Sequence, residues 1–133
     1  MTYDNRTLAF VARVLMALIF VVAGFRKLLA FSATAAYFAK LGLPVPEVLV
    51  ALTIALELIG SAALIAGWHV RVVAAAMALF TIAAAAVAHQ FWAVADPAAF
   101  SAQLNNFLKN VAMVGGFLLL MQPAEPRARQ APV

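Results

Sequence analysis

The chain has 133 residues, of which 67% are hydrophobic and 11% are charged. Soluble domains carry about 25% charged residues, so this chain lacks the polar surface that a water-soluble globule needs. It contains no cysteine, which excludes disulfides, thiol chemistry and cysteine-ligated metals. The net charge is +4, with the basic residues scattered singly. Nothing in this pattern indicates nucleic-acid binding.

Four long apolar segments follow one another, at residues 8–29, 48–66, 71–92 and 103–121. About 20 apolar residues are enough to cross the roughly 30 Å of hydrocarbon in a bilayer, and the segments lack the alternating polarity of membrane β-strands. The sequence therefore predicts an all-α, polytopic protein of the lipid bilayer, an antiparallel bundle of four transmembrane helices. We expect one domain over residues 1–121, followed by a Pro-rich, polar tail at 122–133 that is disordered.

The segment between the first two spans, residues 30–47, is too polar to cross a membrane. We predict a short amphipathic helix here, capped by Ser32 and lying at the membrane interface. Asp96 followed by Pro97 is typical of a helix start before the fourth span. The first apolar run is long enough for a signal peptide, but Arg26 and Lys27 follow at once without a small-x-small cleavage site, so we expect it to be retained.

The second span contains "ALTIALELIG", residues 51–60, with the carboxylate of Glu57 near its centre. An ionisable group there costs about 2.5–3.5 kcal/mol on insertion scales, so such groups face the bundle interior and find partners. In the first span, Arg13 and Lys27 share one helix face with Gly24. In the fourth, Asn106 and Lys109 share a face.

If the helices alternate in direction, polar residues from different spans gather on one side of the membrane. We therefore predict a buried polar pocket or proton relay, open beside the interfacial helix and with Glu57 at its floor. Its members are Glu57, Arg13, Lys27, His89, Lys109, Asn110 and Asn106. Gly24, Gly60 and Gly116 are predicted to be helix-packing positions. His69 and His89 stand about 30 Å apart along a helix, so we expect no shared haem or metal site.

Several short motifs occur in a recognisable order. They are "RVLMALIFVVAGFRK" (13–27), "KLGLPVP" (40–46), "LELIG" (56–60), "GWHVR" (67–71), "HQFW" (89–92) and "FLKNVAMVGGFLLL" (107–120). Over about residues 8–121 the chain resembles the DoxX family of small four-helix bacterial membrane proteins.

The family's polar positions match Arg13, Gly24, Lys27, Glu57, Gly60, Lys109 and Asn110, whereas Ser61 replaces a glycine common after the glutamate motif. The resemblance implies a bacterial cytoplasmic (inner) membrane location. The family takes its name from a subunit of an archaeal thiosulfate:quinone oxidoreductase, and other members stand beside redox enzymes. Five basic residues against four on the two sides favour cytoplasmic termini.

Three functions are compatible with these patterns. The first is an accessory subunit of a quinone-linked redox system, in which Lys27, Lys109 or His89 binds a carbonyl of a quinone or another lipid-like ligand and Glu57 relays a proton. It would have no intrinsic cofactor and would work with a redox enzyme or as a homo-oligomer; catalysis by the chain itself stays open. The second is a scaffold or assembly factor whose buried charges fix helix register. The third, a small-solute or proton pathway, is less favoured because four unbroken helices leave little room for alternating access.

Overall fold

A computed structural model describes residues 5–123. The elements in chain order are α1 (Asn5–Leu29), α2 (Phe31–Lys40), α3 (Pro46–Ala66), α4 (Val70–Ala88), the 3-10 turn η1 (Phe91–Ala93) and α5 (Pro97–Met121). Within residues 5–123 there is no strand, and α1, α3, α4 with η1, and α5 are long and apolar enough to cross a membrane. The predicted all-α bundle of four spans, with a short helix between the first two, is confirmed. Most of the predicted tail, from residue 124 on, lies outside the described residues.

Two helix boundaries differ from the prediction. The interfacial helix α2 begins at Phe31 without a side-chain cap, so Ser32 is not the capping residue. Instead the Thr34 hydroxyl donates to the Ala30 carbonyl at 2.9 Å within the first turn. The α-helix of the third span ends at Ala88, because His89 leaves helical geometry with φ −124 and a 3-10 turn follows.

The fourth span begins where the sequence predicted a helix start. The Asp96 carboxylate accepts a hydrogen bond from the Ala99 backbone N–H at 2.8 Å, and Pro97 is the first helical residue. Proline suits this position because its missing N–H needs no partner there. The helix then runs without a break to Met121.

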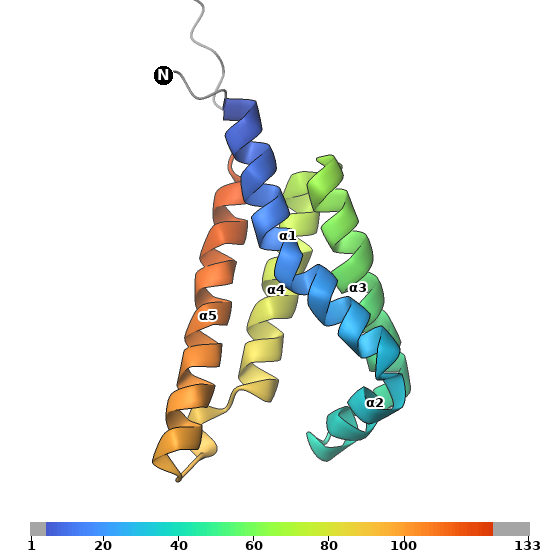
Figure 1. Cartoon of the computed structure of the whole chain (residues 1–133), viewed down its shortest axis with the longest axis vertical. Helices are drawn as coiled ribbons and strands as arrows, with labels where there is room; N and C mark the ends of the chain where they lie inside the picture. Colours follow the sequence, from blue (N-terminus) through green and yellow to red (C-terminus); the bar gives the residue numbers. More distant parts are fainter. Residues whose placement is uncertain (1–4, 124–133) are drawn as a thin grey trace, which may run out of the picture.

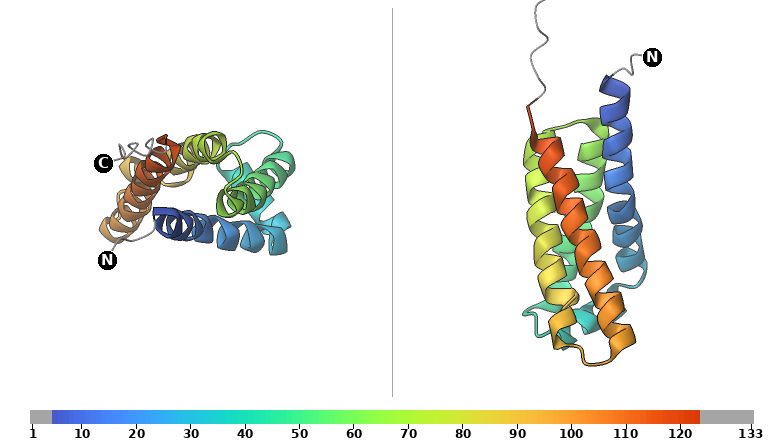
Figure 2. Two further views of the ribbon diagram at one scale, coloured as in Figure 1. Left: turned by 90° about the horizontal axis from the view of Figure 1, so that it is seen from above. Right: turned by 90° about the vertical axis from the view of Figure 1, so that its left-hand side faces the viewer.

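The spans are arranged as two helix pairs (Figures 1 and 2). α1 packs along α3, and α4 packs along α5, while α2 folds back against α3. Within the described chain the turn Gly67–His69, between α3 and α4, is the single backbone connection from one pair to the other. Figure 1 shows the pairs meeting at the end near this turn and diverging towards α2. We call these two ends of the bundle the turn end and the α2 end.

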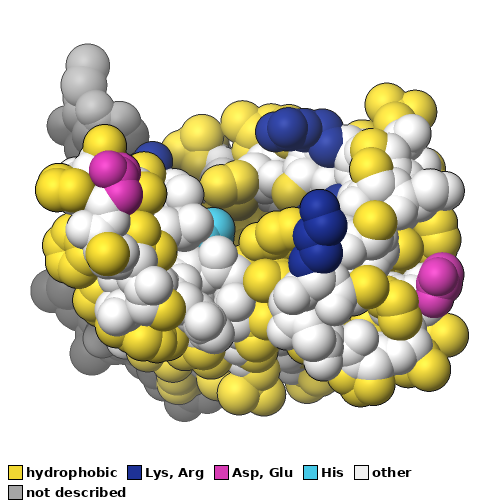
Figure 3. Space-filling view, turned by 90° about the horizontal axis from the view of Figure 1, so that it is seen from below, with side chains coloured by type: hydrophobic (Ala, Val, Ile, Leu, Met, Phe, Trp, Pro, Cys, Tyr) yellow, Lys and Arg dark blue, Asp and Glu magenta, His cyan; other side chains and the backbone are white. Residues whose placement is uncertain are grey.

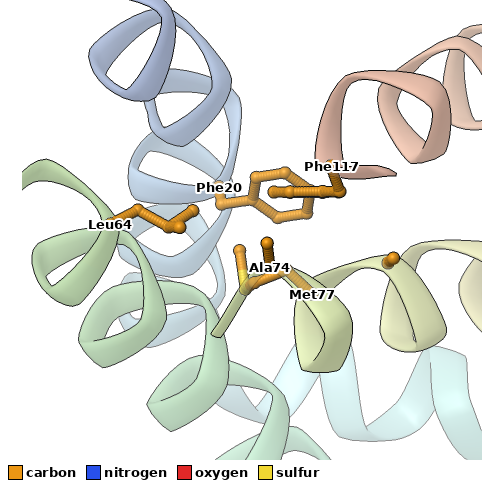
Figure 4. Close-up of a cluster of buried hydrophobic side chains, with 6 residues drawn as sticks. Phe20, Leu64, Ala74, Met77 and Phe117 are labelled. Carbon is orange, nitrogen blue, oxygen red and sulfur yellow. The ribbon is translucent and has the colours of Figure 1, made fainter. Parts of the chain in front are cut away.

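An apolar cluster joins all four spans in the half of the bundle near the turn end. It is centred on Phe20, Leu64, Met77 and Phe117, each at most 5% exposed (Figure 4). The ring centroids of Phe20 and Phe117 lie 5.6 Å apart, and those of Phe20 and Phe80 lie 6.5 Å apart. These tilted aromatic contacts hold the two pairs together at this level.

Three glycines lie where two helices approach closely. A Cβ added to Gly24 would lie 2.7 Å from Leu58 Cδ2, across the contact between α1 and α3. A Cβ added to Gly60 would lie 2.8 Å from the Met77 sulfur, and a Cβ added to Gly116 would lie 2.7 Å from the Met16 sulfur. Each glycine therefore serves a different helix contact: α1 with α3, α3 with α4, and α5 with α1.

We expect Gly24→Ala to destabilise the bundle by about 1–3 kcal/mol, because Leu58 has to move and overpacking costs energy of that order. Gly115→Ala is the matched control, since an added Cβ there meets nothing within 4 Å and alanine favours a helix over glycine by roughly 0.5–1 kcal/mol. Unfolding titrations in mixed micelles should show the two changes moving stability in opposite directions. Equal effects would contradict the close packing of α1 on α3.

Candidate functional site

A cavity of about 770 Å³ lies between the two helix pairs. All four spans and α2 contribute to its wall, and the aromatic rings of Phe20 and Phe80 line its inner end. Figure 3 looks at the α2 end of the molecule, where basic side chains lie beside a hollow. Most lining residues are apolar. The polar ones are Arg26, Lys27, Thr34, Tyr37, Thr53, Glu57, Thr81, His89 and Asn110.

An ion pair on the wall of this cavity joins α1 to α3. The Lys27 ammonium donates to both carboxylate oxygens of Glu57, at 2.7 Å to Oε1 and 2.9 Å to Oε2. The Glu57 side chain is 3% exposed and that of Lys27 is 23% exposed. An ammonium has three donors, so one donor of Lys27 is left to face the cavity.

Gly24 brings the two charged side chains within reach of each other. It lies one turn before Lys27, and a Cβ there would stand only 3.3 Å from the Glu57 Cβ. The backbone of α1 is therefore very close to α3 at this point, and the lysine does not have to extend far along the membrane. The close approach of the two helices allows the Lys27 ammonium to contact both carboxylate oxygens of Glu57.

Asn110 lies across the cavity from the ion pair. The rings of Phe20 and Phe117 touch at one level, and Lys27 and Asn110 each lie seven residues from these rings towards the α2 end. Seven residues are about two helical turns, or roughly 10 Å, and return to the same helix face. Lys27 and Asn110 therefore both lie on the α2 side of the aromatic rings, and both line the cavity.

His89 completes the polar part of the cavity wall. It follows the last residue of α4, and its Nδ1 lies 3.0 Å from Oε1 of Gln103 on α5. When that amide oxygen accepts, Nδ1 carries the proton and Nε2 is an acceptor. Gln103 was not predicted, although it lies on the same helix face as Asn110, seven residues earlier.

Arg13 does not join this cavity, contrary to our expectation. Its Nη1 lies 3.2 Å from where a Cβ of Gly67 would stand, at the turn end, and its Nε is buried without a hydrogen-bond partner among residues 5–123. Arg13 and Lys27 do share a stripe, but fourteen residues along a helix separate them by about 21 Å. A common helix face therefore did not mean a common site.

Lys109 and Asn106 face outward, so the prediction that they lie inside the bundle is wrong. Both are exposed, whereas Phe107 and Asn110 next to them are partly buried and Phe117 is fully buried. One residue rotates a helix face by about 100°, so the packed face of α5 passes beside Lys109. Its long side chain can extend along the helix surface, so that the ammonium reaches the interface.

Among residues 5–123 no cluster of three or more His, Asp or Glu side chains is placed to hold a metal ion. His69 is exposed in the α3–α4 turn. Its ring contacts that of Trp68 edge-on, with 4.6 Å between the ring centroids. It therefore lies at the turn end, whereas His89 lies near the α2 end. Besides the Arg26 guanidinium, the Tyr37 phenol and three threonine hydroxyls, the groups available for chemistry on the cavity wall are an ammonium, a carboxylate, an imidazole and an amide.

The four apolar helices and the paired charges between them define a small multi-pass membrane protein with an internal cavity. Residues 8–90 match the DoxX family model, so the chain belongs to the DoxX family. It is 32% identical over 113 residues to the inner membrane protein YphA of Escherichia coli K12, covering 85% of this chain and 80% of the relative. It is 35% identical over 112 residues to the inner membrane protein YqjF of the same organism, covering 83% and 78%.

No solved structure matches the chain. The two relatives are named as inner membrane proteins, and the chain has four helices able to span a bilayer. The protein is thus a multi-pass protein of the bacterial inner membrane. Cytoplasmic placement of the termini stays a prediction from the distribution of basic residues.

A double-mutant cycle should measure the coupling between Lys27 and Glu57. We expect Glu57→Leu or Lys27→Met alone to cost about 3–5 kcal/mol of unfolding free energy, because each leaves a charge buried without its partner. The double variant should recover most of this loss. Glu47→Gln is the control, since Glu47 is exposed in the first turn of α3 and should cost at most about 1 kcal/mol. Additive single effects would show that the two charges do not interact.

Proposed function

We propose that this protein is an accessory subunit of a membrane redox system and holds a quinone in the cavity between its helix pairs. The observation that carries the proposal is the Lys27–Glu57 pair on the wall of an apolar cavity of about 770 Å³. Cavities of roughly 300–1,000 Å³ with apolar walls and a few polar groups are typical of small-molecule sites. The link of the DoxX family to a thiosulfate:quinone oxidoreductase supports a quinone as the ligand.

The polar groups suit the two carbonyl oxygens of a quinone ring. The third donor of Lys27 is free to donate to one carbonyl, while the amide of Asn110 lines the cavity from α5 and can donate to the other. The apolar walls, including Phe20 and Phe80, would contact the ring and the alkyl tail. This arrangement fixes the ring by few hydrogen bonds and leaves the affinity to apolar contact, as is usual for such sites.

Reduction of a quinone to a quinol takes two electrons and two protons, which convert both carbonyls to hydroxyls. In our proposal a partner enzyme supplies the electrons, and the cavity supplies the proton path. Glu57 and His89 are the groups that can exchange protons there. In the opposite direction, quinol oxidation releases two protons, and the same groups would accept them.

A scaffold function is the alternative, and one observation favours it. The Lys27–Glu57 pair is bidentate and connects two neighbouring spans, which is also the geometry of a pair that only fixes helix register. In that case the double variant Lys27→Met/Glu57→Leu should keep its partner proteins in a pull-down from native membranes. It should also keep the cellular phenotype of the wild type.

Quinone binding separates these two functions. We expect the purified protein to bind decylubiquinone. The double variant Lys27→Met/Glu57→Leu should raise the dissociation constant about 10- to 150-fold, because a hydrogen bond to a charged group is worth about 1.5–3 kcal/mol. Equilibrium dialysis in detergent measures both constants. Lys109→Met is the matched control, since it removes an outward-facing lysine and should leave binding unchanged. Equal binding by the double variant, or none by the wild type, would contradict the quinone site.

A further inference from the structure

We infer that the cavity receives its ligand sideways from the bilayer, as an amphiphile whose polar head points to the α2 end and whose tail points to the aromatic cluster. This inference rests on the ligand cavity proposed above and adds the route and the orientation. It depends on three features of the described residues. These are where the cavity wall is exposed, how deep those places lie, and how polarity changes along the wall.

Exposed residues that line the cavity mark its openings. Two of them lie within the spans: Ile19 on α1, which is 51% exposed, and Ala83 on α4. The others, Arg26, Ala30, Ala33 and Tyr37, lie at the end of α1 or on α2. The cavity therefore has openings at the sides of the bundle as well as at the α2 end.

The side openings lie at the depth of the hydrocarbon. Ile19 stands ten residues before the end of α1, and Ala83 stands five residues before the end of α4. At 1.5 Å per residue these positions are about 15 Å and 7.5 Å inside their helices. A molecule dissolved among the lipid tails would meet the cavity directly at these two places.

Polarity changes along the cavity wall in one direction. Its charged and amide groups, Lys27, Glu57 and Asn110, lie about 10 Å closer to the α2 end than the rings of Phe20 and Phe117. A lipid-like molecule in the adjacent leaflet has the same orientation, with its head at the interface and its tail towards the midplane. It can therefore slide between the pairs without turning over and without exposing its tail to water.

The opening at the α2 end is less suited to such a molecule. α2 folds back across this end, and the neighbouring rings of Tyr37 and Phe38 line the cavity, as does the exposed cation Arg26. An alkyl tail entering here would first have to leave the hydrocarbon and pass a polar rim. Water and protons can use this opening, whereas the apolar ligand has a direct path at the sides.

Tryptophan substitutions can close one route at a time. The variant Ile19→Trp/Ala83→Trp narrows both side openings and leaves the ion pair unchanged. The variant Ala30→Trp/Ala33→Trp narrows the α2 end. The control Leu18→Trp/Ala86→Trp places two tryptophans at exposed positions of the same helices that do not line the cavity. Each protein is reconstituted in vesicles, and folding is checked by its elution and helical circular dichroism.

The measurement is the association rate of radiolabelled decylubiquinone, delivered from donor vesicles and followed by rapid filtration. We expect the side-closing variant to associate at least tenfold more slowly than the wild type. The control should stay within twofold of the wild-type rate, and the end-closing variant should remain closer to that rate than the side-closing variant does. If the end-closing variant is the slow one, or if the side-closing variant binds at the wild-type rate, the inferred route is wrong. A wild type that binds no decylubiquinone at all would instead contradict the proposed function, which keeps the two failures apart.

Discussion

An unpaired charge is costly in the hydrocarbon of a membrane. The arrangement of the helices in this bundle depends on how the charge of Glu57 is paired. The carboxylate lies within α3, where an unpaired ion costs several kcal/mol, and the bidentate contact with Lys27 neutralises it. The pair needs α1 and α3 to be in close contact, and Gly24 allows that contact. α4 and α5 pack along each other as the second pair. The cavity is the space that the pairs leave between them.

The same constraint separates two halves of the bundle with different physical characters. Near the turn end, Phe20, Met77 and Phe117 fill the interior, and the packing is mainly apolar apart from the buried Ser61 hydroxyl and the Arg13 side chain. Near the α2 end, the interior holds an ammonium, a carboxylate, an imidazole and an amide around open space. One half of the interior is thus filled by side chains, whereas the other half contains the cavity.

Composition and hydrophobic length were sufficient to predict the spans, because no other fold accommodates four apolar segments with so few charges. The partnership of Lys27 and Glu57 could also be anticipated, since a buried carboxylate needs a cation and Lys27 shares a face with Gly24. Arg13 was misplaced because periodicity gives the face of a residue and not its depth along the helix. Lys109 was misplaced because the polar residues of α5 are neighbours in sequence, and a shift of one residue turns the face by about 100°. Gln103 was missed because the pairing with His89 depends on how α4 ends, which the apolar pattern does not record.

The connectivity of the two pairs has a mechanical consequence. At the α2 end the connections join helices of the same pair. Within residues 5–123 the backbone therefore links the pairs through the turn Gly67–His69 alone, where Gly67 and His69 have positive φ. The turn can therefore act as a pivot between the two helix pairs. The ends of the pairs near α2, which we call the tips, are not joined to each other by backbone within residues 5–123. Over helices roughly 30 Å long, a rotation of about 5° at the pivot moves the tips by about 2–3 Å. The width of the gap at the tips is thus the dimension of the bundle that a small change in helix tilt alters most.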